Sequence, residues 1–196
     1  MSHLFGKRIR LRAVEKEDLS LFVRWINDPQ VTEDLLFSAP MSRVDEEKWF
    51  EAMINTPLSE HVLVIEVQDP KIKGNFLTIG TCQFHNIDSR NRSAEVGIMI
   101  GEKSFWDQGY GTETMQLLLK HGFNTLNFHR IWLQVIAKNK RGIHAYQKAG
   151  FQYEGKYRQS HYQHGQYFDI HLMSILKDEW QAMATLDEQP QKGGKP

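Results

Sequence analysis

The sequence predicts one α/β domain in which a central mixed sheet, mostly antiparallel, has helices on both of its faces. Two observations lead to this prediction. Residues 62–67, 77–85 and 93–100 are β-prone runs joined by short polar turns, as in an antiparallel meander. A long helical pattern and a further strand follow over 109–135, as in a parallel crossover unit. Antiparallel pairs followed by such a unit imply a single mixed sheet.

The chain before the meander is expected to supply one strand and two helices. Residues 9–12 alternate apolar and polar side chains, as a half-buried strand does. Asp18 is placed to cap a helix that carries Leu19, Phe22, Trp25 and Ile26 on one face. Pro29 is expected to end that helix, because the residue before a proline avoids the helical region. Residues 28–43 then form a loop with an apolar tip before the second helix.

After the crossover, a short helix and two strands are expected. Asn139 is placed to cap the helix, which stops near Gly150, and the two strands flank the turn at His164 and Gly165. The polar tail 187–196 is expected to be disordered, which leaves 1–186 as one domain.

Composition excludes several classes of partner. Lys plus Arg and Asp plus Glu both number 24, so the basic excess of a nucleic-acid or anionic-membrane binder is absent. The single cysteine, Cys82, excludes a disulfide framework within the chain and CxxC metal sites. No apolar run long enough for a membrane span occurs, and no signal-peptide pattern opens the chain. We therefore expect a cytoplasmic protein, and a homo-oligomer is compatible with the sequence.

The first chemical feature is the pair Gly109 and Gly111, between a strand and a long helix. Glycines there let the backbone approach a ligand, and the helix N-terminus adds partial positive charge, which suits a pyrophosphate. Two glycines before a helix are by themselves more often a plain turn. The pair is no Rossmann fingerprint, because the third glycine would fall at Thr114, and no P-loop sequence occurs.

The second feature is Asn139 with Tyr146, seven residues or about two helical turns further on. Each has a plain alternative reading, Asn139 as a helix cap and Tyr146 as a core residue. However, the glycine pair and Asn139 both follow the C-terminal ends of strands expected to be parallel neighbours. Ligands bind at that edge of open α/β sheets.

Together these motifs resemble the GNAT acetyltransferases. The pyrophosphate loop of that superfamily reads Gln/Arg-x-x-Gly-x-Gly/Ala, and this chain matches it at Gly109 and Gly111 but has Trp106 at the first position. An aromatic residue followed by Gly-Tyr-Ala/Gly-Thr-Glu resembles the branch of ribosomal-protein N-acetyltransferases (RimJ/RimL type), to which spermidine N-acetyltransferase is related. The stretches that agree with this branch are 8–12, 25–29, 94–98, 139–155 and 173–176, with Arg158, Gly165 and Asp169.

The resemblance implies an N-acetyltransferase that uses acetyl-CoA as co-substrate. The acceptor would be a primary amine of a small molecule or the α-amine of a peptide, attacking directly in a ternary complex. Tyr146 matches the general acid of the family. The implied cofactor-binding residues are Met99, Ile100 and Gly101, which would pair with the pantetheine arm like an added strand, the loop residues Gln108, Gly109, Tyr110, Gly111 and Thr112, and Asn139 and Tyr146.

A base is also needed, because an amine attacks only when it is neutral and alkyl amines have a pKa near ~10.4. Glu95 is the candidate, acting directly or through water. It lies on the expected central strand, on the same face as Gly97. The alternative is a solvent-facing charge.

The acceptor and the class of activity have alternatives. Spermidine N-acetyltransferase carries an acidic pair in the loop that corresponds to residues 38–41 here, where no acid occurs, although Glu33 and Asp34 lie just before. A polyamine or amino sugar is therefore the alternative acceptor. A non-catalytic CoA-binding module would not need both Glu95 and Tyr146, and another α/β nucleotide binder is disfavoured by the missing third glycine.

Overall fold

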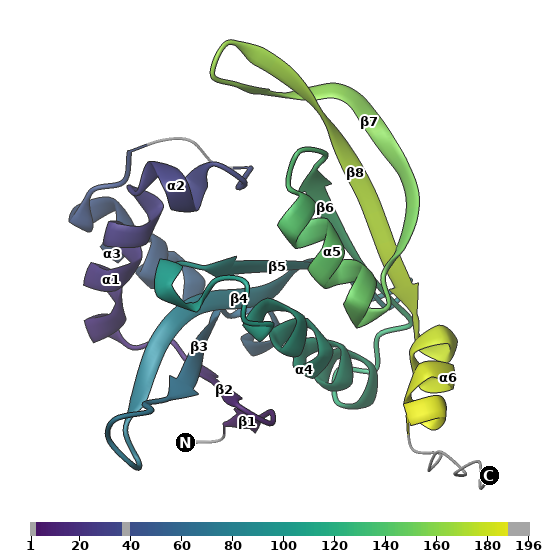
Figure 1. Cartoon of the computed structure of the whole chain (residues 1–196), viewed down its shortest axis with the longest axis horizontal. Coiled ribbons are helices and arrows are strands. Elements are labelled where there is room, and N and C mark those ends of the chain that lie inside the picture. Colours follow the sequence, from purple (N-terminus) through teal and green to yellow (C-terminus); the bar gives the residue numbers. More distant parts are fainter. Residues whose placement is uncertain (1–2, 37–39, 188–196) are drawn as a thin grey trace, which may run out of the picture.

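Eight strands form one sheet in the order β1-β2-β3-β4-β5-β6-β8-β7 (Figure 1). The structure is a computed structural model that describes residues 3–36 and 40–187. The strands are β1 (Leu4–Phe5), β2 (Ile9–Ala13), β3 (Leu63–Gln68), β4 (Phe76–Asp88), β5 (Ser93–Ile100), β6 (Arg130–Ile136), β7 (Gln152–Gln163) and β8 (Gln166–Leu176). The helices are α1 (Leu19–Ile26), α2 (Pro29–Thr32), α3 (Arg43–Met53), α4 (Tyr110–Asn124), α5 (Lys140–Ala149) and α6 (Lys177–Asp187), with short 3-10 turns η1 (Lys16–Asp18), η2 (Leu58–Glu60) and η3 (Lys103–Phe105).

The pairing of the strands confirms the predicted mixed sheet. Each neighbouring pair is antiparallel except β5 and β6, which are parallel and are joined through α4. Two apolar clusters cover the two faces of the sheet. The larger includes Met115, Leu118 and Phe123 of α4, and the smaller includes Phe22 and Trp25 of α1. None of the described helices is long and apolar enough to cross a membrane.

The expected cap of α1 is wrong. The Asp18 carboxylate accepts no hydrogen bond from a backbone N–H of α1; it accepts one from Glu15 N at 2.9 Å and faces the Arg12 guanidinium at 2.6 Å. An ion pair with Arg12, together with the hydrogen bond from Glu15 N, has therefore replaced the cap of α1 that Asp18 offered.

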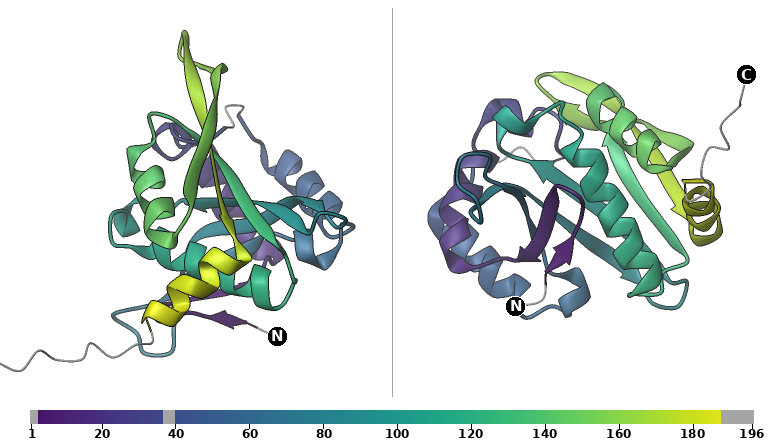
Figure 2. Two further views of the ribbon diagram at one scale, coloured as in Figure 1. Left: turned by 90° about the vertical axis from the view of Figure 1, so that its right-hand side faces the viewer. Right: turned by 60° about the horizontal axis from the view of Figure 1, so that its bottom comes forward.

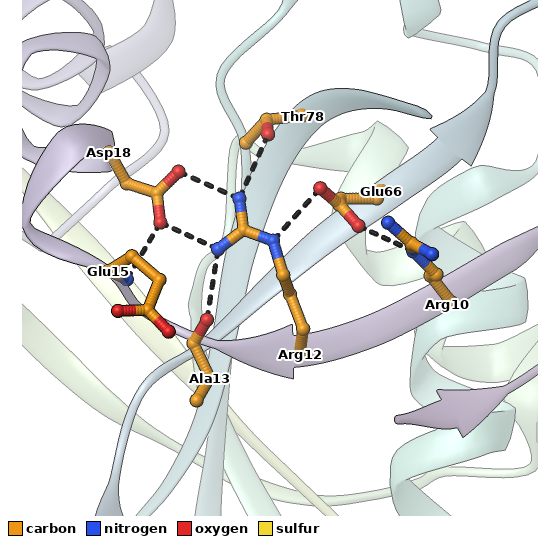
Figure 3. Close-up of polar contacts among 7 residues, drawn as sticks. All are labelled: Arg10, Arg12, Ala13, Glu15, Asp18, Glu66 and Thr78. Carbon is orange, nitrogen blue, oxygen red and sulfur yellow. Dashed lines mark hydrogen bonds and ion pairs between the residues drawn. The ribbon is translucent and has the colours of Figure 1, made fainter. Parts of the chain in front are cut away.

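An arginine in the sheet organises this corner of the domain (Figure 3). Arg12 donates to Asp18 at 2.6 and 2.8 Å and through Nε to Glu66 at 2.9 Å, while Arg10 donates to the other oxygen of Glu66 at 2.6 Å. Both carboxylates are buried. Because each buried acid has a charged partner, the network joins β2, η1 and β3 without leaving an unpaired charge.

The expected end of α1 at Pro29 is also wrong. The helix already ends at Ile26, and Pro29 is the first residue of α2, where its missing N–H costs no hydrogen bond. Asp28 has the extended backbone expected before a proline, and its side chain caps α2 by accepting from Gln30 N at 2.9 Å. The segment expected to be a plain loop over 28–43 therefore contains a helical turn.

The C-terminal helix α6 was not predicted. Trp180 packs on Phe123 with ring centroids 5.4 Å apart, and Met183 covers Gly150 at the end of α5. Two apolar side chains of α6 make these contacts, and two are too few to give its sequence a clear helical repeat of apolar residues. The expected disordered tail lies, apart from Asp187, outside the described residues.

Candidate active site

The parallel strands β5 and β6 pair only at their N-terminal ends. Paired residues run from Ser93 with Arg130 to Glu95 with Trp132, and the strands then diverge (Figure 1). β6 remains paired with β8 along its length, and β4 covers the outer edge of β5. The inner edge of β5 beyond Glu95 has no partner strand in the described part of the chain. Its free N–H and C=O groups can bind an extended ligand arm as an added strand would.

A cavity of about 360 Å³, called here the first cavity, opens at this divergence. Its walls are the end of β5, the glycine loop and α5, which confirms that the glycine pair and Asn139 meet at one edge of the sheet. The predicted cofactor-binding residues that line it are Met99, Ile100, Gly109, Tyr110, Gly111, Thr112, Asn139 and Tyr146.

The glycine loop has the backbone geometry of an anion site. Gly109 is the N-cap of α4 with φ of 82°, a left-handed conformation that favours glycine. Gly111 lies in the first turn, and a Cβ added there would meet nothing within 4 Å. The first N–H groups of α4 have no partner within the helix, and the helix dipole favours negative charge at this end. A diphosphate group fits this arrangement.

Two predicted cofactor-binding residues do not line the first cavity. A Cβ on Gly101 would fall 2.1 Å from Cδ2 of Trp25, so this glycine permits close packing against α1. The side chain of Gln108 donates to Ser104 O at 2.6 Å, and the backbone carbonyl of Gln108 accepts from Arg8 Nη1 at 3.0 Å. Gly101 and Gln108 therefore make packing and hydrogen-bonding contacts outside the first cavity.

Trp106, the departure from the family pattern, does line the first cavity. Its indole N–H donates to Ile100 O at 2.7 Å, which fixes the ring against the end of β5. The guanidinium of Arg141 lies 3.9 Å from the ring centroid and also lines the cavity. Arg141 was missed by sequence reasoning, because only the fold brings the start of α5 to the glycine loop.

Asn139 and Tyr146 lie on the wall formed by α5. Asn139 caps the helix by accepting from Gly142 N at 2.7 Å, so its structural reading is confirmed, and it lines the first cavity as well. Tyr146 is half-buried, packs edge-on against Phe151, and its hydroxyl has no hydrogen-bond partner among the described residues. Burial, followed by the charge of Asp34, raises the pKa of Tyr146 to about 12. The phenol is therefore protonated at neutral pH.

Glu95 is not a solvent-facing charge, since only 6% of it is exposed. Its carboxylate accepts from Asn86 at 2.7 Å and from Gln134 at 3.3 Å, and His85 Nε2 lies 3.3 Å away. Burial opposes ionisation, but the hydrogen bonds from His85 and Asn86 outweigh it and lower the pKa of Glu95. Glu95 is thus ionised at neutral pH, at the point where β5 and β6 separate, and it lines neither cavity directly.

His85 is a candidate that sequence reasoning missed. It stands opposite Glu95 across the β4–β5 ladder, and its ring lies beside Gly97, where an added Cβ would be 3.4 Å from Cε1. Its Nδ1 is buried and has no hydrogen-bond partner in the described part of the chain. With Nε2 protonated toward Glu95, Nδ1 is left as a proton acceptor.

A second cavity, of about 460 Å³, lies between α1, α3 and the strands β4 and β5. Leu35, Ile98 and Met99 line both cavities, so the two adjoin at the end of β5. Leu35 belongs to the apolar loop tip that the sequence predicted. The other described lining residues are Phe22, Ile26, Leu36, Met41, Glu46, Trp49, Val62, Thr81, Cys82, Gln83 and Gly97, of which only Glu46 is charged.

Residues 8–152 match the family model of the acetyltransferase (GNAT) domain, which is more than half of the chain. The chain belongs to the GNAT acetyltransferases. The predicted fold, enzyme class and co-substrate are thereby confirmed: it is an N-acetyltransferase that transfers acetyl from acetyl-CoA to an amine. The divergent strands and the glycine loop described above fit the pantetheine arm and the pyrophosphate of CoA.

Relatives support the assignment over most of the chain. An uncharacterized N-acetyltransferase p20 of Bacillus licheniformis is 32% identical over 184 residues, 92% of this chain and 99% of that protein. Spermidine N(1)-acetyltransferase of Vibrio cholerae is 27% identical over 176 residues, 89% of this chain and 96% of that protein. The crystal structure of the Vibrio cholerae spermidine N-acetyltransferase in complex with CoA and spermine has a TM-score of 0.80 at 25% identity, covering 90% of this chain and 99% of that one.

Proposed function

We propose that this enzyme acetylates the primary amine of a small molecule, or the α-amine of a peptide, whose apolar body occupies the second cavity. The observation that supports this most is the junction of the two cavities at Leu35, Ile98 and Met99. An acceptor in the second cavity reaches the end of β5, where the acetyl-bearing arm of the co-substrate would end. Mostly apolar walls with few polar groups are typical of small-molecule sites.

Spermidine is the second candidate acceptor, because relatives are named for it. The two acidic residues just before residues 38–41, Glu33 and Asp34, give little support to spermidine as the acceptor. The Glu33 carboxylate lies 2.5 Å from Lys138 Nζ and 3.1 Å from His164 Nε2 at the turn of the β7–β8 hairpin, which projects from the sheet (Figure 2). Asp34 lines the first cavity, not the second. Spermidine would retain two positive charges after one amine becomes neutral, and the second cavity offers one carboxylate.

A direct comparison of acceptors tests this proposal. Thiol release from acetyl-CoA would be measured with a short alkyl amine, an amino sugar, a peptide with a free N-terminus and spermidine. We expect the alkyl amine or the peptide to give the highest kcat/KM. A highest value with spermidine would reverse the ranking and make Glu33 and Asp34 the first residues to replace.

The residues around the junction suggest a division of roles. The co-substrate supplies an acetyl thioester, and acetyl transfer releases a thiolate. Tyr146 holds a proton on the wall of the first cavity and can protonate the departing sulfur. His85 and Glu95 lie on the same face of β4 and β5 as Gln83 and Gly97, which line the second cavity. Because His85 and Glu95 do not line it themselves, the amine proton would reach His85 through water, and the Glu95 carboxylate would orient His85 and stabilise the resulting imidazolium.

Replacing Glu95 with glutamine is expected to confine activity to alkaline pH. Glu95 is ionised at neutral pH because its pKa is lowered, so wild-type enzyme can accept the amine proton well below the pKa of the amine. The amide cannot balance an imidazolium, so the variant depends on amine that is already neutral, which for an alkyl amine becomes abundant only near pH ~10. The measurement is kcat/KM against pH from neutral to alkaline values.

His85→Gln is the companion variant for the same measurement. If the two residues act as one unit, it shifts the profile in the same direction as Glu95→Gln. Identical profiles for wild type and Glu95→Gln would remove Glu95 from proton transfer. A shift in Glu95→Gln without one in His85→Gln would assign the transfer to water beside Glu95.

A further inference from the structure

Glu46 is the exception among the buried acids of the described chain. It is 7% exposed, close to the values for Asp18, Glu66 and Glu95. Those three carboxylates all have ionic or hydrogen-bonding partners, whereas the side chain of Glu46 has none among the described residues. A buried carboxylate without a partner costs the protein free energy, so its presence calls for a reason beyond stability.

No cationic side chain among the residues that the structure describes forms an ion pair with Glu46. It lies in the first turn of α3 and lines the second cavity. The nearest cationic side chain on its helix, Arg43, instead faces Glu47 at 2.9 Å and also contacts Ser20. Burial raises the pKa of Glu46, against a smaller opposing effect of the Arg43 charge. The carboxylate therefore lines an apolar cavity in which no described residue pairs with its charge, and a bound cation could do so.

Aromatic side chains in the same cavity suit a positively charged ligand with a hydrocarbon body. Phe22 and Trp49 both line the second cavity, and their ring centroids are 6.3 Å apart in an edge-to-face arrangement. Aromatic faces attract alkyl ammonium groups and also bury methylene chains. The carboxylate and the two rings together form a site for an alkyl ammonium.

The bound cation differs from the amine that reacts. Glu46 lines only the second cavity and Tyr146 lines only the first. The reacting amine must be neutral and close to the junction of the two, whereas Glu46 requires a charged partner. We propose that Glu46 binds a second cationic group of the acceptor, so that the preferred acceptor is a primary amine with one further positive charge beyond an apolar spacer. This inference rests on the proposed use of the second cavity by the acceptor.

Cadaverine and hexylamine test the proposal, because they match in length and differ in the ammonium or methyl group at the far end. Wild-type enzyme is expected to prefer cadaverine by about 10-fold or more in kcat/KM, the range of a charge-assisted contact. In Glu46→Gln this preference is expected to fall to about 1. Glu47→Gln is the matched control, since Glu47 is the next residue, is only half-buried, and does not line the cavity. It should retain the wild-type preference.

A binding measurement separates this inference from the proposed function. Calorimetric titration of cadaverine into the CoA-saturated protein should show an affinity about 10-fold or more lower in Glu46→Gln than in wild type, whether or not either amine is acetylated. The variant is expected to melt no lower than wild type, because it removes an unpaired buried charge. Equal cadaverine affinity in the two proteins, or an unchanged preference for cadaverine over hexylamine, would overturn the role of Glu46. Acetylation of neither amine, with binding still dependent on Glu46, would instead count against the proposed function alone.

Discussion

Replacing Gly111 with valine is expected to abolish the rise in melting temperature that CoA produces. A ligand at 100 times its Kd stabilises the folded state by about 2.7 kcal/mol, which for a domain of this size is about 5–10 °C. Gly111 lies in the first turn of α4 on the wall of the first cavity, and its missing side chain leaves open space there. Two methyl groups would occupy the space where the backbone approaches a diphosphate. Thermal melts with and without CoA measure the effect.

Gly155→Val is the matched control. Gly155 lies on β7, a Cβ added there also meets nothing within 4 Å, and it does not line either cavity. Valine is favourable in strands and costs less than about 1 kcal/mol in a helix, so both variants are expected to fold. The control should keep the full response to CoA. A full response in a folded Gly111→Val protein would show that the diphosphate binds elsewhere.

Local patterns were sufficient to predict most of the residues that line the first cavity. The strands of the meander and the helix after Gly109 can be predicted because their patterns lie within short stretches of sequence. The parallel strand pair then follows from the order of these elements along the chain. Once β5 and β6 were parallel neighbours, the glycine loop and Asn139 had to meet at one edge. Eight of the ten predicted cofactor-binding residues line the first cavity.

The proposed acceptor side could not be predicted in this way, because its residues are brought together by strand register and by long-range packing. His85 becomes a candidate only when the β4–β5 ladder places it opposite Glu95, and a slip of one residue would turn it to the other face. From the sequence alone, Glu46 is indistinguishable from an ordinary acidic residue in the first turn of a helix, where acids are common. Only the packing of α3 shows that it is buried and has no partner among the described residues.

The wrong prediction for Asp18 shows that a local sequence rule can also fail outside the site. Its position before an apolar run is typical of a helix N-cap, but its carboxylate forms a buried ion pair with Arg12, six residues earlier in the sequence. A cap contributes about 1 kcal/mol, whereas breaking a buried pair costs about 3–5 kcal/mol. The stronger interaction therefore fixes the position of the carboxylate.

Replacing Tyr146 with phenylalanine is expected to lower kcat by about 100-fold while CoA binding stays the same. The change removes only a hydroxyl that has no partner among the described residues, and phenylalanine keeps the edge-on contact with Phe151. A pKa of about 12 ensures that Tyr146 carries its proton at neutral pH, but it also makes Tyr146 a weak acid toward a thiolate whose conjugate acid has a pKa near ~8.5. The proton must therefore move as the carbon–sulfur bond breaks, which places the expected loss at the low end of the ~10²–10⁴-fold range for a positioned acid.

Two measurements on Tyr146→Phe separate catalysis from packing. The first is kcat from thiol release at saturating acetyl-CoA and acceptor, where loss of an interaction formed only in the transition state lowers kcat and kcat/KM together. The second is the melting temperature with and without CoA, which should match wild type because the hydroxyl contributes to neither state. Unchanged kcat with a lower melting temperature would make Tyr146 a packing residue of α5, and the proton for the departing sulfur would then have to come from water in the first cavity.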